Sequence, residues 1–274
     1  MRGTIVAVSI GALLASSPAA AVPGVDEPAK IEVSTLRKPL LRKYEAVVAG
    51  LDAFDKHHAL APDVPEPQFR IRLSSVAKTV LASPEQLRVR LEGDRDFILP
   101  LALGAGNLFT VPRSQAALDT KAELVLNQKR RDYRIEPHVR TPGLPANVRR
   151  LGDLRLECEV TMAIAKEEMP LLMVLAANSL FMSRDWCTIF TEDKTLFSVT
   201  TADPVSRATL QEGERTQALK VKGSGFDVAI ADVSWGDNAL VTLEFGDPGT
   251  APAAPQAAPE ALTGTAGETP RTAP

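Results

Sequence analysis

The longest strict alternation of apolar and polar residues in the chain runs from Leu154 to Met162 and has the sequence LRLECEVTM. Every second side chain in it is apolar, and those between are polar or charged. In a strand, this period places one face on a core and the other in water. The stretch therefore predicts a half-buried strand and indicates a protein whose core is formed by sheets.

Shorter stretches of similar texture lie on both sides of it, separated by turn residues. The dipeptide Gly93-Asp94 sits between two of them and predicts a hairpin. About ten short strands at regular spacing predict a mainly β fold, either one β-sandwich or two small ones. The expected strands cover residues 69–73, 87–91, 97–99, 124–126, 133–135, 154–162, 188–191, 196–200, 207–210, 218–221, 228–230 and 239–245.

Two segments have helical character instead. Residues 39–58 carry an apolar stripe at helical spacing, which predicts an amphipathic N-terminal helix. Residues 170–182 are almost wholly apolar, and a helix that is apolar on all sides is normally buried. We therefore expect one buried apolar helix between the strands.

The N-terminus has the pattern of a cleavable signal peptide. Arg2 precedes the uncharged apolar run 5–15, and the small residues Ala19 to Ala21 offer a cleavage site after Ala21. We expect a periplasmic or secreted protein. Arg2 is the only charged residue of this segment, so cleavage changes the formal net charge from −3 to −4. This mild acidity argues against a nucleic-acid partner. No later apolar run reaches the length of a membrane span.

Cys158 and Cys187 are the two cysteines of the chain. In an oxidising compartment such a pair usually forms a disulfide, whereas two buried free thiols are the alternative. The expected bond would attach the segment after the apolar helix to the segment before it.

The composition divides the chain into five parts. Residues 1–21 are the signal peptide, and residues 22–66 are a helical segment with a Pro-rich linker. Residues 67–165 are a first β-rich domain, and residues 166–246 are the buried helix with a second β-rich part. Residues 247–274 are rich in Pro and Ala, and we expect them to be disordered.

The sequence contains no recognisable catalytic, metal or cofactor motif. The histidines His57 and His58 are adjacent, a spacing that does not put two ligands on one helix face, and His138 stands alone among prolines. The acidic pairs fall in expected turns or at a helix start, where Asp and Glu are common. We predict no catalytic residue, no metal site and no cofactor.

The most distinctive stretch is basic. Residues 121–155 contain nine Lys or Arg against four acids. Arg140, Arg149, Arg150 and Arg155 are the candidate binding residues, because guanidinium groups bind carboxylates and phosphates through two hydrogen bonds. The alternative is a solvated face whose arginines pair with acids of neighbouring strands.

Three stretches resemble a group of uncharacterised exported proteins of Gram-negative bacteria. They are TPGLPANVRRLGDLRLECEV (residues 141–160), DFILP (residues 96–100) and AELVLN (residues 122–127). This resemblance implies export and no known activity. The alternation of apolar and polar residues in 69–127 also resembles that in the small β-sandwich of carboxypeptidase-regulatory domains. Neither resemblance implies a functional residue.

Three functional hypotheses follow. The first is a non-enzymatic exported β-sandwich protein that binds an anionic envelope component or an acidic partner protein. The second is a cell-wall hydrolase with paired catalytic carboxylates, whose separation in space is not visible in the sequence. The third is an inhibitor or accessory subunit of an envelope enzyme.

Overall fold

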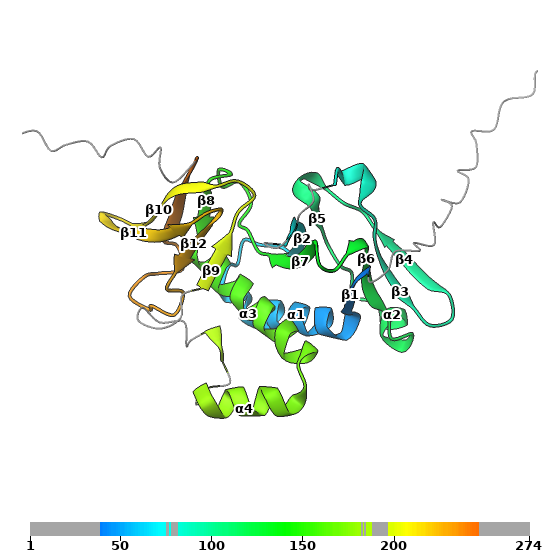
Figure 1. The fold of residues 1–274 in the computed structure, drawn as a ribbon. Coiled ribbons are helices and arrows are strands. Elements are labelled where there is room, and N and C mark those ends of the chain that lie inside the picture. The colour runs from blue at the N-terminus through cyan, green and yellow to red at the C-terminus, as the bar shows by residue number, and fades with distance from the viewer. Residues whose placement is uncertain are drawn as a thin grey trace, which may run out of the picture. The chain divides into compact units, whose positions relative to one another are not determined.

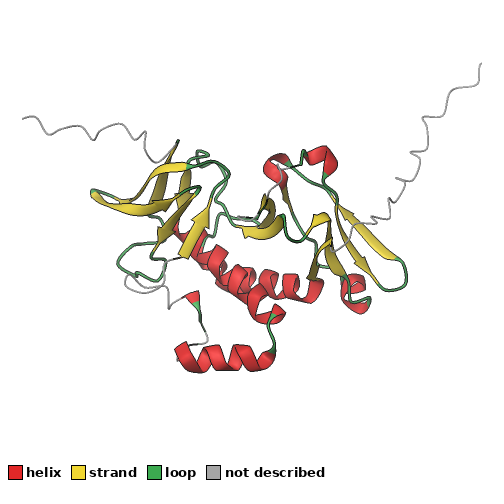
Figure 2. Cartoon of the chain, in the orientation of Figure 1, coloured by secondary structure: helices red, strands yellow, loops and turns green. Residues whose placement is uncertain are grey.

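Antiparallel strands form three sheets in the described part of the chain (Figures 1 and 2). The computed structural model describes residues 39–74, 77, 82–181, 183, 185–187 and 197–246, which all belong to one compact unit, Leu36–Pro274. The prediction of a mainly β protein is confirmed. The expected signal peptide, the expected C-terminal tail and the expected strand at 188–191 lie outside the described residues.

The first sheet contains the predicted hairpin. Its strands are ordered β1-β6-β3-β4, and β3 pairs with β4 so that Gly93 faces Phe97. Arg95 and Asp96 between them have positive φ angles of 58° and 59°, a conformation typical of tight hairpin turns. The strands are β1 (Pro39–Lys43), β3 (Val89–Gly93), β4 (Phe97–Leu101) and β6 (Glu123–Lys129).

Two further sheets complete the β structure. A three-stranded sheet has the order β5-β2-β7, with β2 (Gln68–Leu73), β5 (Leu108–Phe109) and β7 (Tyr133–His138). A six-stranded sheet has the order β8-β13-β10-β11-β12-β9. Its strands are β8 (Val148–Arg150), β9 (Phe197–Thr200), β10 (Val205–Glu212), β11 (Arg215–Lys222), β12 (Gly225–Val228) and β13 (Leu240–Phe245).

The stretch Leu154–Met162 is helical, so the prediction of a strand there is wrong. It lies within helix α3 (Leu151–Glu168). At 100° per residue, alternate positions of a helix fall on two separate faces. Leu154 and Cys158 belong to one hydrophobic core, whereas Leu156, Val160 and Ile164 belong to another. The period of two therefore comes from a helix buried on two sides.

These two cores organise the described structure around α3. The first contains buried residues of α1, α3 and the two smaller sheets, among them Tyr44, Phe69 and Leu91. The second contains the start of α3 and the inner face of the six-stranded sheet, among them Phe226 and Trp235. Because α3 contributes to both, it is the element that joins them.

Helix α1 (Tyr44–His57) packs along α3 (Figure 1). The prediction of a helix over residues 39–58 is correct for this part, but residues 39–43 form β1 and pair with β6. The backbone amide of Tyr44 donates to the Ala122 carbonyl at 2.9 Å, where strand pairing gives way to the helix. Gly50 allows the close approach of the two helices, since a Cβ there would lie 2.7 Å from Ile164 Cγ1.

Helix α4 (Leu171–Phe181) is exposed, so the prediction of a buried apolar helix is wrong. Leu172 and Leu180 are 79% and 78% exposed. We expected a wholly apolar helix to lie in the core of the protein. In the structure, α3 is the helix that contributes to both cores, and the described side chains of α4 contribute to neither. None of the described helices combines the length and hydropathy needed to cross a bilayer. The short helices are η1 (His58–Leu60), η2 (Pro84–Gln86), η3 (Ala105–Asn107) and α2 (Gln115–Asp119).

Candidate anion-binding cavity

A cavity of about 230 Å³ lies where α3 meets strands from all three sheets. It is smaller than the roughly 300–1,000 Å³ of pockets for drug-sized ligands, so it fits a small molecule. Helix α3 and the strands β1, β2, β7 and β9 supply its walls. The lining residues are Arg42, Arg70, Ile135, Glu136, Pro137, Glu157, Thr161, Ile164, Ala165, Glu168, Phe197, Ser198, Val199 and Thr200.

Each of the three glutamates in the lining has its own arginine. Glu168 pairs with Arg42 at 3.1 Å, and Glu136 pairs with Arg72 at 3.4 Å. Glu157 accepts from Arg149 Nη2 at 3.0 Å and from the backbone amide of Val139 at 3.0 Å. These contacts neutralise the carboxylates locally, so the glutamates do not give the cavity an excess of negative charge.

Arg70 differs from these arginines. Its Nη2 donates to the Thr200 carbonyl at 3.1 Å, but no carboxylate of the described residues lies within ion-pair distance of it. Its Nε is buried and has no hydrogen-bond partner in this part of the structure. Burial lowers the pKa of the Arg70 guanidinium, as do the charges of Arg72 and Arg149, whereas the carboxylates of Glu157 and Glu136 raise it. Glu157 and Glu136 are themselves paired with Arg149 and Arg72, so Arg70 has no carboxylate of its own among the described residues.

The side chain of His138 lies in the electrostatic field of Arg70 and of two neighbouring arginines. Its pKa is lowered to about 2 by burial, and by the charges of Arg149, Arg70 and Arg140. The ring is therefore neutral at neutral pH, chiefly because it is buried, and it adds no charge beside the cavity. Apolar walls from Ile135, Ile164, Phe197 and Val199 complete the cavity. The arrangement suits a small organic anion with an apolar portion.

The arginines predicted as binding residues do not form one unpaired patch. Arg149 lies in the buried pair with Glu157, next to the cavity. Arg140 donates to the carbonyls of Leu144, at 3.0 Å, and Pro145. These two side chains hold the loop before β8 and the start of α3 together. Their role in binding stays a prediction.

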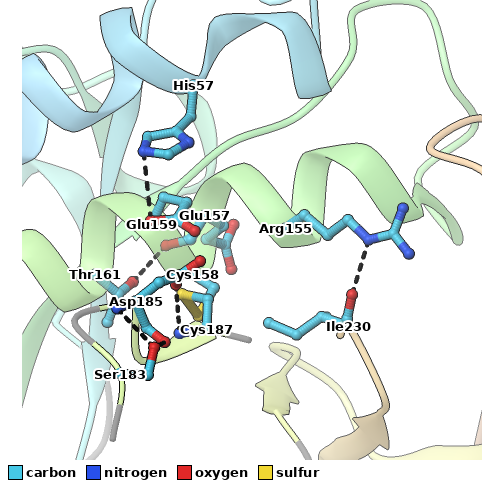
Figure 3. The surroundings of a disulfide bond; sticks show 10 residues. All are labelled: His57, Arg155, Glu157, Cys158, Glu159, Thr161, Ser183, Asp185, Cys187 and Ile230. Carbon is cyan, nitrogen blue, oxygen red and sulfur yellow. Dashed lines mark hydrogen bonds and ion pairs between the residues drawn. A yellow bond between two sulfur atoms is a disulfide. The ribbon is translucent and has the colours of Figure 1, made fainter. Parts of the chain in front are cut away.

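The other two predicted arginines also bind groups of this chain. Arg150 donates to the Asp237 carbonyl at 3.1 Å and to the Leu60 carbonyl at 3.1 Å. Arg155 donates to the carbonyl of Ile230 at 2.8 Å and to the carboxylate of Asp237 at 2.5 Å (the Ile230 contact is drawn in Figure 3). Arg150 connects β8 to Leu60 and to the loop before β13, and Arg155 connects α3 to the same loop. Their binding role likewise stays a prediction.

The predicted disulfide between Cys158 and Cys187 is present. Figure 3 shows it beside the carboxyl groups of Glu159 and Asp185. Oxygens of these two groups and the Cys187 sulfur lie within 4.8 Å of one another. The sulfur is already bonded to Cys158 and is not available as a thiolate ligand. Neither Glu159 nor Asp185 is among the residues that line the cavity.

Arg70 is not among the residues that the sequence patterns single out. It lies in the alternating strand 68–73, where arginines between apolar residues indicate a solvated face. The helix α3 and the strand β9 cover this face, and they come from distant parts of the chain. The only available signal was a pair of arginines on one strand face, and that pattern did not identify a cavity.

Comparisons with protein-family models, with curated proteins and with solved structures find no match to this chain. The assignment of a function therefore depends on the geometry described above.

Proposed function

We propose that the protein is an exported, non-enzymatic binding protein whose cavity takes a small organic anion from an envelope component. The observation that carries this proposal is Arg70, a partly buried guanidinium in a cavity wall that has no carboxylate partner among the described residues. A carboxylate or phosphate would complete its hydrogen bonds and balance its charge. The disulfide supports export, since such bonds persist in oxidising compartments.

The arrangement of the glutamates favours binding over hydrolysis. Glu136, Glu157 and Glu168 each form an ion pair with an arginine of the chain, so none of these carboxylates is left free to act on a substrate. The contact between Glu159 and Asp185 is closer than the roughly 5–10 Å at which two carboxyl groups flank a glycosidic bond. Neither set of acids supports the hydrolase hypothesis.

The proposal predicts that Arg70→Gln weakens the binding of small carboxylates and phosphates by about 10- to 100-fold. This range corresponds to the loss of a charged hydrogen-bonding group worth about 1.5–3 kcal/mol. Calorimetric titration and ligand-induced shifts of the melting temperature would measure the effect on a panel of small organic anions. Arg70→Lys should have an intermediate affinity, because it keeps the charge but loses the planar fork.

The matched control is Arg134→Gln, which removes an exposed arginine from the adjacent strand β7. It should bind like the wild type. If anions stabilise the wild type, Arg70→Gln and Arg134→Gln equally, they act on the surface in general and the cavity proposal is wrong. Melting curves without ligand show whether either variant has lost its fold.

A further inference from the structure

Helix α4 presents large apolar side chains to solvent over more than one face. Its exposed residues are Leu171 (72%), Leu172 (79%), Met173 (58%), Leu175 (53%) and Leu180 (78%). At 100° per residue, they span an arc of about 200° around the helix axis. A stripe that packs on one protein surface is narrower, at roughly 100°. The exposed surface of α4 therefore matches an apolar medium that surrounds the helix better than one flat partner.

Of the residues of α4, Ser179 is the one exposed polar side chain within this arc, and it carries no charge. No charged residue lies between Glu168 and Phe181. The side-chain oxygen of Asn178 accepts from Trp186 Nε1 at 2.9 Å, so it is bound within the chain. The helix therefore lacks the charged face that amphipathic helices turn toward water.

Both ends of the α4 segment are attached to α3. At one end, the Met169 amide donates to the Ala165 carbonyl at 3.1 Å. At the other end, Cys187 is bonded to Cys158, and the Lys166 ammonium lies 5.0 Å from the centre of the Trp186 ring. The disulfide thus closes a loop that carries α4, and the chain leaves and returns on the same side of the helix.

We propose that α4 inserts among the acyl chains of one leaflet of a phospholipid bilayer and holds the protein at a membrane surface. The helix has 11 residues, so it is about 16 Å long. Because both ends of its segment are attached to α3, the helix would lie along the membrane plane, and its diameter of about 10 Å fits within one leaflet, which is roughly half of the 30 Å hydrocarbon core. Between the first and last turns of the helix the backbone hydrogen bonds are internal, as an apolar medium requires. This inference rests on no part of the cavity proposal.

A second copy of the chain is a poorer occupant. The exposed arc of α4 has an area on the order of 300 Å², from the dimensions of an 11-residue helix. Two such surfaces would bury about 600 Å², below the roughly 1,200 Å² of a stable interface. Lipid has no such area threshold, because the hydrocarbon contacts every exposed side chain.

The test is flotation with phosphatidylcholine vesicles. The chain from residue 22 onward is used, because the apolar run 5–15 would itself bind lipid, and the compact unit begins at Leu36. We expect this protein to float with the vesicles. The double variant Leu172→Gln/Leu180→Gln should bind roughly 100-fold more weakly, since two leucine side chains no longer enter hydrocarbon. Anionic lipid should change the binding little.

The matched control is Val233→Gln, because Val233 is an apolar residue 93% exposed outside α4. It should float like the wild type. All three substituted side chains are exposed, so the variants should keep the fold. A wild-type protein that stays in solution, or a double variant that floats as well as the wild type, overturns the proposal. So does a lipid-free dimer that Leu172→Gln/Leu180→Gln converts to monomer, which would make a second copy the occupant.

Discussion

Glu159 is the residue whose charge depends most directly on its surroundings at neutral pH. Burial, the Asp185 carboxylate and a hydrogen bond to Asp185 raise its pKa to about 7, while Lys166 and Lys56 act in the opposite direction. His57 lies 3.7 Å away, but burial and Lys56 lower its pKa, which Asp185 raises. Both partners thus shift toward their neutral forms, so His57 and Glu159 are a weak ion pair at neutral pH.

This raised pKa makes stability depend on pH. The folded protein binds a proton at Glu159 between about pH 4.5 and 7, whereas the unfolded chain releases it. The contribution to stability is therefore complete below about pH 4.5 and is lost as the pH rises through about 7. It amounts to at most about 3 kcal/mol. Urea unfolding at pH 5 and pH 8 should show the loss in the wild type and a smaller loss in Glu159→Gln.

Glu167→Gln is the control for this experiment, because Glu167 is an exposed glutamate on the same helix. Its pH dependence should match that of the wild type. Equal pH dependence in Glu159→Gln and the wild type would show that the pair with Asp185 does not hold an extra proton.

At the scale of elements, strands were easier to predict than helices. The hairpin of β3 and β4 and most later strands follow from local alternation and turn residues, which act over a few positions. Helix α3 could not be predicted in this way, because a helix buried on two faces and a strand buried on one face can show the same alternation of apolar and polar residues. Length offers the distinction: 18 residues of α3 exceed an ordinary strand. The exposure of α4 depends on which elements fill the cores. No local sequence pattern carries that information.

The disulfide attaches the segment that contains α4 to helix α3. It joins positions 29 residues apart. Closing a loop of that size stabilises the folded state by roughly 3–4 kcal/mol in the chain-entropy model. The double variant Cys158→Ser/Cys187→Ser should lower the free energy of unfolding by about that amount, as measured by denaturant titration.

Reductant provides the internal check on this value. Dithiothreitol should destabilise the wild type to a similar extent and should leave the double serine variant unchanged. If the wild type keeps its stability after full reduction, confirmed by thiol counting, the bond does not hold this loop to α3 energetically.

At the scale of the whole molecule, the candidate site could not be predicted because it is assembled from distant segments. Arg70 comes from β2, its hydrogen-bond acceptor Thr200 comes from β9, and Glu157 comes from α3. These residues are farther apart in the sequence than the span of any local pattern. The basic region 121–155 stands out in the sequence by its charge, and in the structure its four candidate arginines donate hydrogen bonds to acceptors of the same chain.

The two cores should unfold together, because α3 is part of both. Leu156 is fully buried in the first core, and Trp235 lies in the second. Leu156→Ala should cost about 2–5 kcal/mol. It should lower the melting temperature reported by Trp235 fluorescence as much as that reported by circular dichroism. A Trp186→Phe background removes the other tryptophan signal.

Leu154→Ala is the matched variant, since Leu154 is also fully buried on α3 but belongs to the second core. Calorimetry should show one transition in the wild type and in both variants. A Trp235 transition that does not move in Leu156→Ala, or a second calorimetric peak, would show that the cores unfold independently.

The two buried faces of α3 also restrict its length. Inserting or deleting one residue near Cys158 would turn the following part of the helix by about 100° relative to the part before it. Val160 and Ile164 would rotate away from the first core, while the arginine contacts before the insertion would stay in place. Sequence changes by substitution can be absorbed on either face separately, but a change in length misaligns both at once. This helix therefore sets a fixed spacing between the two halves of the protein.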